Sequence, residues 1–339
     1  MQTTHSALLG LLGLVAITVT GALCAQENGT LKFKAHKKFN FVMPKEVWTN
    51  SAGGLRVRHV AGDRFRAMRD GVKMVVDTTG DGETNGVVKG SKGYLRFMSK
   101  KGGKKFQYAA RFKGGNGIYQ YSSACSMSGT VGGVPIRLFD LNNNGSFSEL
   151  EADAIIVGKG KAATYLSKVI SYKGELYNLI VADDGKSATV SAYEGDSGKL
   201  SLAAFLSKGK LESAIVSDGK NSFQVGRSRG YVVPTGEYKI VAGMVRKGSA
   251  TARIRGGKMA ALRVRADKIV KLKWGGPLIA EFTHTLGGGK VTVDPKNLSY
   301  FGKAGVEFYG WAPDAKSPKF KVHDPDTGKE VGGFIFAGC

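Results

Sequence analysis

Proline and cysteine are scarce in this chain, and helical periodicity is weak. Of its 339 residues, 8 are proline and 3 are cysteine. The cysteine spacing fits neither a zinc site nor a redox motif, which excludes those two classes of site. Beyond Leu23 no apolar run approaches the length of a membrane helix, so we expect no transmembrane span in the mature chain.

Glycine, in contrast, is abundant, with 49 residues, about twice its usual share. Gly-Lys, Gly-Gly and Asp-Gly pairs recur between short runs of Val, Ile, Leu, Phe and Tyr, which is typical of short strands joined by tight turns. The pattern predicts a mainly β fold with two or three antiparallel, sandwich-like β domains. Short helices are predicted only at 148–156 and 162–169.

Changes in this pattern of apolar runs and turn residues divide the chain into four parts. Residues 1–25 contain an apolar run, 7–23, with the length of a signal-peptide core. We therefore expect a protein that is secreted, periplasmic or held at the cell surface. The remainder is expected to form an N-terminal β region (26–200), a β-sandwich-like domain (201–274) and a small Ig-like β domain (275–339).

Strands are predicted throughout the C-terminal half, at 213–216, 223–225, 238–245, 251–255, 262–266, 269–274, 319–322 and 333–337. Among them, Val233-Pro-Thr-Gly-Glu-Tyr-Lys-Ile240 resembles the Pro-x-Gly-x-Tyr strand entry of carboxypeptidase-regulatory-like β-sandwiches. The resemblance covers one strand and implies a sandwich around it.

An acidic loop follows a strand-like segment in the N-terminal region: Asp140-Leu-Asn-Asn-Asn-Gly-Ser-Phe-Ser-Glu-Leu-Glu151. A hard divalent cation needs roughly six to eight oxygens in a flexible cage. Alternate residues of the loop would supply them: side-chain oxygens from Asp140, Asn142 and Asn144, the backbone carbonyl of Ser146, and Ser148 directly or through water. Glu151 would close the site with both carboxylate oxygens, and Gly145 would permit the sharp turn between the two halves.

This loop resembles the twelve-residue calcium loop of the EF-hand family, with Phe147 where the family packs an apolar residue. The resemblance covers the loop alone, since residues 127–139 predict a strand in place of the incoming helix. It implies a Ca²⁺ site of roughly 10⁻⁴ to 10⁻³ M affinity, because only Asp140 and Glu151 among the side-chain ligands are charged. The alternative is a metal-free hairpin turn, since Asn-Gly between apolar runs is a strong turn signal.

A second loop, Asp77-Thr-Thr-Gly-Asp-Gly-Glu-Thr-Asn85, repeats part of this spacing. Its candidate ligands are Asp77, Thr79, Asp81 and Glu83, with Gly82 at the sixth position. The twelfth position is Val88, so a closing carboxylate would have to come from elsewhere, or be replaced by water. The shared order of strand, acidic loop and strand suggests a diverged internal repeat.

Two cysteines, Cys125 and Cys339, remain once the signal segment is removed. In an oxidising compartment they could form a disulfide. Two separate thiols are the other possibility, and the sequence leaves both open.

Basic residues dominate the charge, with 50 Lys and Arg against 27 Asp and Glu and a net charge of +23. In segments 55–58, 64–66, 253–255, 262–265 and 271–273, cations alternate with apolar residues, which places them on one strand face. Such a face would suit an anionic cell-envelope polymer, either polysaccharide or lipid head groups; the alternative is a solvated outer face. No nucleic-acid-binding fingerprint is present, so we expect no dedicated nucleic-acid binding.

Two motifs that resemble catalytic sequences are better explained as turns. Gly195-Asp-Ser-Gly198 lacks the flanking residues of a serine-protease nucleophile, and Gly226-Arg-Ser-Arg-Gly230 precedes a strand-like run in place of a helix. The sequence thus favours a calcium-binding structural or interaction protein of the cell envelope, in contact with envelope polymer or other surface proteins. The alternative is a module that binds anionic polymer, and a secreted hydrolase is the third possibility. The sequence therefore leaves enzymatic activity open but does not favour it.

Overall fold

The computed structural model describes residues 26–288, 290–294, 297–313 and 319–335. Within these ranges the chain is mainly β and has no α-helix, which confirms the predicted fold class. A short 3₁₀ segment, η1 (Ala61–Asp63), is present. The predicted signal segment 1–25 and Cys339 lie outside the described residues. No helix in the described ranges has the length and apolarity to cross a membrane.

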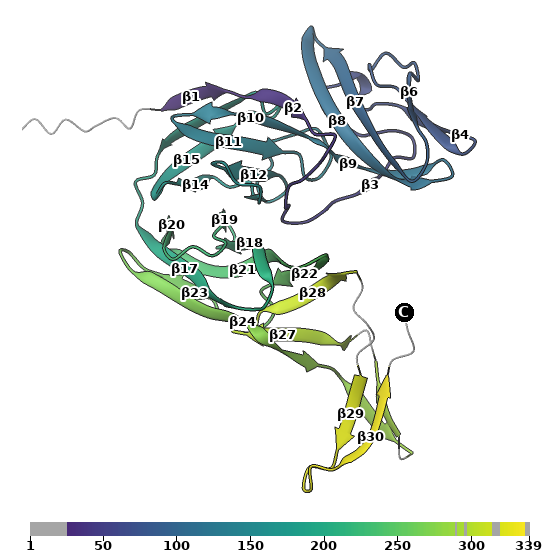
Figure 1. Cartoon of the computed structure of the whole chain (residues 1–339). Helices are drawn as coiled ribbons and strands as arrows, with labels where there is room; N and C mark the ends of the chain where they lie inside the picture. The colour runs from purple at the N-terminus through teal and green to yellow at the C-terminus, as the bar shows by residue number, and fades with distance from the viewer. Residues whose placement is uncertain (1–25, 289, 295–296, 314–318, 336–339) are drawn as a thin grey trace, which may run out of the picture.

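The N-terminal body consists of two antiparallel sheets that share one core (Figure 1). The first sheet has the order β13 (Thr164–Tyr165), β12 (Ala154–Val157), β11 (Val134–Phe139), β10 (Cys125–Val131) and β2 (Lys32–Ala35). The second has the order β1 (Glu27–Thr30), β16 (Ser187–Ala192), β15 (Glu175–Val181) and β14 (Val169–Tyr172). Leu138 of β11 and Leu179 of β15 belong to the same buried cluster, which joins the two sheets.

Residues 49–123 form a lobe beside these sheets (Figure 1). One of its sheets has the order β3 (Thr49–Asn50), β9 (Ile118–Ser123), β8 (Lys104–Gly115) and β7 (Lys92–Lys101). The other has the order β4 (Ala67–Asp70), β5 (Lys73–Val76) and β6 (Gly86–Val88). Phe106 and Tyr108 of β8 are buried in the same cluster as Leu138. The alternate residues of the strand, Lys105 and Gln107, are exposed. The lobe therefore packs against the N-terminal body through the apolar face of β8.

A ten-stranded sheet makes up the C-terminal body. Its order is β19 (Ser222–Gln224), β18 (Lys210–Ser217), β21 (Gly236–Lys247), β22 (Ala250–Arg255), β28 (Glu307–Ala312), β27 (Ser299–Lys303), β24 (Ile269–Glu281), β17 (Ser197–Leu206) and β20 (Tyr231–Pro234), with β23 (Leu262–Val264) paired to β21. The fully buried Trp274 donates from Nε1 to the carbonyl of Leu202 at 3.0 Å. The Tyr238 hydroxyl donates to the carbonyl of Pro234 at 2.9 Å, which fixes the entry into β21.

Strands are found at each predicted position between 213 and 274, but the predicted division at 274 falls inside β24. This strand continues through Gly275-Gly276-Pro277 with a register shift, and β27 and β28 pair with β24 and β22. The strand residues 275–281, 299–303 and 307–312 thus belong to the C-terminal sheet, across the boundary predicted at 274. The predicted helices are also wrong, because 148–156 contains a turn and β12, and 162–169 contains β13. Ala154, Ile155 and Ile156 are all buried, so β12 lacks the alternation that marks a half-exposed strand.

Two hairpins extend from the C-terminal body at the lower end of Figure 1. They pair β25 (His284–Gly287) with β26 (Lys290–Val293), and β29 (Lys319–His323) with β30 (Glu330–Ile335). In the second hairpin the rings of Phe320 and Phe334 stack with centroids 4.8 Å apart. The predicted strands at 319–322 and 333–337 overlap this hairpin as far as residue 335.

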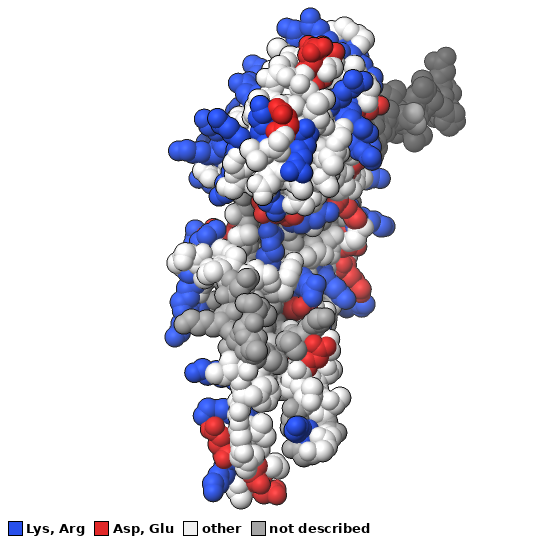
Figure 2. Space-filling view, turned by 90° about the vertical axis from the view of Figure 1, so that its right-hand side faces the viewer, with Lys and Arg blue, Asp and Glu red and all other residues white. Residues whose placement is uncertain are grey.

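The predicted alternation of cations and apolar residues on a strand face is confirmed in β22, β23 and β24. Segments 55–58 and 64–66 also alternate in burial, but they lie outside the strands and are joined only by the bridge between Leu55 and Phe65. Figure 2 shows Lys and Arg covering more of the displayed face than Asp and Glu. Part of this charge is neutralised locally, because Arg255 pairs with Glu307 at 2.6 Å and Arg263 with Glu237 at 2.7 Å. Lys271 and Lys273 are exposed, and neither forms an ion pair with any residue that the structure describes.

Candidate metal centre

Asp140 organises the acidic loop that follows β11. Its side chain is buried, and Oδ2 accepts hydrogen bonds from the Tyr108 hydroxyl and from the Gly145 amide, both at 2.8 Å. Oδ1 accepts from the Asn144 amide at 3.1 Å. Burial raises the pKa of Asp140 to about 6, although these hydrogen bonds act in the opposite direction. The Asp140 carboxylate, at the edge of the core, thus fixes the backbone of the loop around it.

Two structural expectations for residues 140–151, the sharp turn and the apolar anchor, are confirmed, and both are compatible with a metal-free turn. Gly145 has φ +83°, and a Cβ at this position would lie 2.6 Å from Cγ1 of Val57. Phe147 is fully buried and belongs to the main core cluster. The loop therefore makes its sharp turn at the sixth position and is anchored from beneath at the eighth.

Gly145→Ala is expected to destabilise the protein, because alanine is strained at this φ and its methyl group would collide with Val57. Backbone strain alone suggests about 1 to 3 kcal/mol. Urea unfolding of the variant would measure the loss. Gly133→Ala, at φ +72° with nothing within 4 Å of its added Cβ, is the matched control for strain without collision. Equal losses in the two variants would contradict the role assigned to Val57.

Glu149, and not Glu151, lies against the loop's amide side chains. Its Oε2 accepts hydrogen bonds from Nδ2 of Asn142 and, at 2.8 Å, from Nδ2 of Asn144. Its Oε1 lies 2.7 Å from a guanidinium nitrogen of Arg58. Oδ1 of Asn142 is buried and accepts no hydrogen bond from any described residue. The loop thus contains an oxygen that is shielded from water and lacks a donor.

Glu151 is exposed and faces a different part of the surface. It lines a crevice together with Tyr165 and Asp218, and its amide donates to the carbonyl of Leu166 at 3.2 Å. In an EF-hand, an exit helix carries the twelfth residue back toward the first. Here the amide of Asp153 donates to the carbonyl of Glu149 at 2.9 Å, and the chain then enters β12. That turn leaves position ten, Glu149, beside the asparagines.

Asp153 ties the end of the loop to its beginning. Its Oδ1 accepts from the Leu141 amide at 3.2 Å, and its Oδ2 accepts from the Glu149 amide at 2.9 Å. Burial, and then the neighbouring charge of Asp140, raises the pKa of Asp153 to about 8. The EF-hand pattern assigns no role to this position, so the sequence analysis did not find it.

Asp183 joins the loop from the turn between β15 and β16. Its Oδ1 accepts hydrogen bonds from Oγ of Ser146 at 2.6 Å and from Oγ of Ser148 at 3.2 Å. Arg58 and His59 face the same carboxylate, at 3.6 Å and 3.2 Å. Partial burial would raise the pKa of Asp183, but the two serine hydrogen bonds and the neighbouring His59 and Arg58 hold it below its usual value. The two predicted serine ligands are thus brought together by a residue distant in sequence.

The second loop is closed by its own backbone. Oδ1 of Asp77 accepts from the amides of Thr79 at 2.9 Å and Gly80 at 2.6 Å, and Oδ2 accepts from Gly82 at 2.9 Å. Asp81 accepts from the amide of Glu83, and both side chains are exposed. Arg64 and Arg66 line the same hollow as Asp77 and Asp81. Val88 stands at the twelfth position in place of a closing carboxylate, and Asp81 and Glu83 are exposed, so this loop is a poorer candidate than the first.

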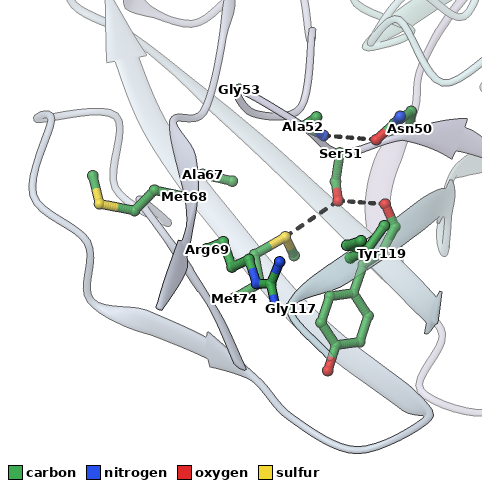
Figure 3. Close-up of a pocket in the computed structure, with 11 residues that line it drawn as sticks. Asn50, Ser51, Ala52, Gly53, Ala67, Met68, Arg69, Met74, Gly117 and Tyr119 are labelled. Atoms are coloured by element: carbon green, nitrogen blue, oxygen red, sulfur yellow. Dashed lines mark hydrogen bonds between the residues drawn. The ribbon is translucent and has the colours of Figure 1, made fainter. Parts of the chain in front are cut away.

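A hollow in the lobe offers no catalytic arrangement (Figure 3). Figure 3 shows Ser51 between Met74 and Tyr119, and its Oγ lies 2.6 Å from the carbonyl oxygen of Tyr119 and 3.2 Å from Sδ of Met74. The described residues that line the hollow include no histidine or carboxylate to activate the hydroxyl. Ser51 therefore fastens β3 to β9 and β5.

Cys125 is a buried, free thiol beside the loop. Its Sγ lies 3.6 Å from Oγ of Ser123, whose amide donates to Oδ1 of Asn143 at 2.7 Å. Burial raises the pKa of the thiol to about 12, which disfavours the reactive thiolate at neutral pH.

Comparison of the chain with protein-family models, with curated proteins and with solved structures gave no match. Function must therefore be inferred from the chemistry of the molecule itself. Among the described residues, no group of three or more His, Cys, Asp or Glu side chains converges to hold a metal. The acidic loop is not a group of this kind, because asparagine side chains would supply half of its side-chain ligands.

Proposed function

We propose that the loop 140–151 binds Ca²⁺ and thereby stabilises the N-terminal body of an extracellular structural or interaction protein. The observation that carries the proposal is the buried, unpartnered Oδ1 of Asn142, in a loop whose other side chains also offer oxygens. A half-turn of the Asn142 carboxamide exchanges its nitrogen and oxygen and would turn the oxygen toward Glu149. Oδ1 of Asn144 accepts from the Ser146 amide at 2.8 Å and keeps a second lone pair for a metal. The ligands would be Asp140, Asn142, Asn144 and Glu149, with Ser146 contributing its carbonyl.

In the structure, Arg58 supplies a positive charge beside Glu149. Bound calcium would supply that positive charge instead. The Arg58 side chain is half exposed, so its pairing with Glu149 contributes little to stability and can be exchanged for a metal contact. The stability of the loop, which has few apolar residues, would then depend on the Ca²⁺ concentration outside the cell.

Thermal and urea unfolding in Ca²⁺ and in chelator would test the proposal. At 10 mM Ca²⁺, affinity of roughly 10⁻⁴ to 10⁻³ M stabilises the native state by about 1.4 to 2.7 kcal/mol. Mg²⁺ at the same concentration is the control, because it demands a smaller and more rigid octahedral cage. Identical unfolding curves in Ca²⁺ and chelator would contradict the proposal.

Binding of an anionic polymer through the basic strand face is the second candidate. Lys271 and Lys273 on β24 support it, since they project outward and have no ion pair with any described residue. Lys199 on the neighbouring β17 is also exposed. These lysines form the control for the experiment below.

A further inference from the structure

A crevice of about 580 Å³ lies between the two bodies. Its walls come from β12, β13 and the turn after β14 in the N-terminal body, and from β18, β19 and β20 in the C-terminal body. Its volume falls within the range of roughly 300 to 1,000 Å³ that is usual for small-molecule sites, which often occur between domains. No residue of the acidic loop lines it.

A buried hydroxyl in the wall of this crevice has no hydrogen-bond partner. Thr164 is only 6% exposed, and its Oγ1 is unpaired within the described residues. An unpaired buried hydroxyl is unfavourable in the free protein. A ligand with hydroxyl or carboxylate oxygens would supply the missing partner.

The charge of the crevice is positive. Lys161 and Lys173 are exposed at its rim and form no ion pair with a described residue. Lys210 is held by Glu212, with Nζ and Oε1 3.3 Å apart. Two uncompensated cations therefore remain to attract an anionic group.

Tyr172 and Tyr231 add aromatic surface to the lining, and Gln224 adds an amide. Nζ of Lys173 lies over one face of the Tyr172 ring, 5.4 Å from its centroid, so a ligand that pairs with this ammonium also lies beside the ring. Oε1 of Gln224 accepts from the amide of Ala214 at 2.9 Å, which leaves its NH₂ group to donate to a ligand. A small inorganic anion would make no use of the two tyrosines. A sugar ring has an apolar face for aromatic contact and hydroxyl groups around its edge.

We infer that this crevice binds an acidic saccharide, through a sugar ring that carries a carboxylate. The carboxylate contacts Lys161 and Lys173, the ring lies against the tyrosines, and the ring hydroxyls meet Thr164 and Gln224. The inference is independent of the calcium proposal, because the two sites share no residue.

Calorimetric titration of the full chain with trigalacturonate would test it. One saturable site is expected, with binding weakened by added NaCl and undetectable for the neutral trisaccharide maltotriose. Binding is expected to persist in chelator, and its loss there would place the ligand on the calcium loop and overturn the inference. Absence of saturable binding, or equal affinity for maltotriose, would also overturn it.

Variants would locate the site. The double variant Lys161→Gln and Lys173→Gln is expected to bind about tenfold or more weakly, whereas Lys199→Gln with Lys271→Gln should bind as the wild type does. Thr164→Val should weaken binding without lowering the melting temperature, since its hydroxyl has no partner to lose. An equal loss in the Lys199 and Lys271 control would assign binding to the basic strand face and exclude the crevice.

Discussion

Glu149→Gln is expected to reduce calcium affinity by at least about tenfold, and Glu151→Gln to leave it unchanged. Glu149 contacts both asparagines of the loop, whereas Glu151 is exposed beside Tyr165 and Asp218. Each substitution removes one charge without changing side-chain size, so the two variants are matched.

Calcium titration after chelator treatment would compare them. Glu149→Gln also removes the ion pair with Arg58, so the calcium effect should be taken as the difference between the two conditions within each variant. Loss of affinity in Glu151→Gln with full affinity in Glu149→Gln would restore the EF-hand assignment and contradict the structural one.

In chelator, the free energy of unfolding is expected to fall as the pH rises from about 4 to about 8. The pKa of Asp153 is raised by burial, and then by the charge of Asp140, from 3.8 to about 8. Burial raises the pKa of Asp140 to about 6. Each folded-state pKa lies above its unfolded value, so the stabilisation is complete below the unfolded pKa and is lost as the pH rises through the folded one.

Between the two pKa values, each carboxyl group changes the free energy by at most about 1.4 kcal/mol per pH unit. Urea unfolding at several pH values would measure the slope. Asp153→Asn, which keeps a neutral side chain at every pH, is expected to give a shallower dependence above pH 6. Parallel curves for the variant and the wild type would show that Asp153 does not carry the effect.

Local chemistry explains which parts of the acidic loop were predictable. Asp140, Gly145 and Phe147 are recognisable because a chain that turns tightly after a buried strand needs a capping oxygen, a positive φ and an apolar anchor at fixed spacings. Asp183 and Arg58 reach the loop from other strands, and no short pattern links them to it. Glu151 was assigned by a pattern that assumes an exit helix, which this fold does not have.

The same limit explains the division of the C-terminal half. Alternation and turn residues predicted the strands of the C-terminal body between 213 and 274, but not β17, which spans the boundary predicted at 200. A change in the pattern of strand-like runs and turns then suggested a boundary after Trp274, where Gly275-Gly276-Pro277 follows. Pairing of β24 with β17 and β27 carries the strand through this point, and that pairing is a long-range property.

The contacts of Asp183 with the acidic loop affect how the native state opens. Through Ser146, Ser148, Arg58 and Glu149, it links three stretches of chain that are far apart in sequence. If any one of them detaches, each of the other two loses one of its contacts. The segment around Arg58, the loop and the β15–β16 turn should therefore exchange their amide protons as one cooperative unit, and not fray separately.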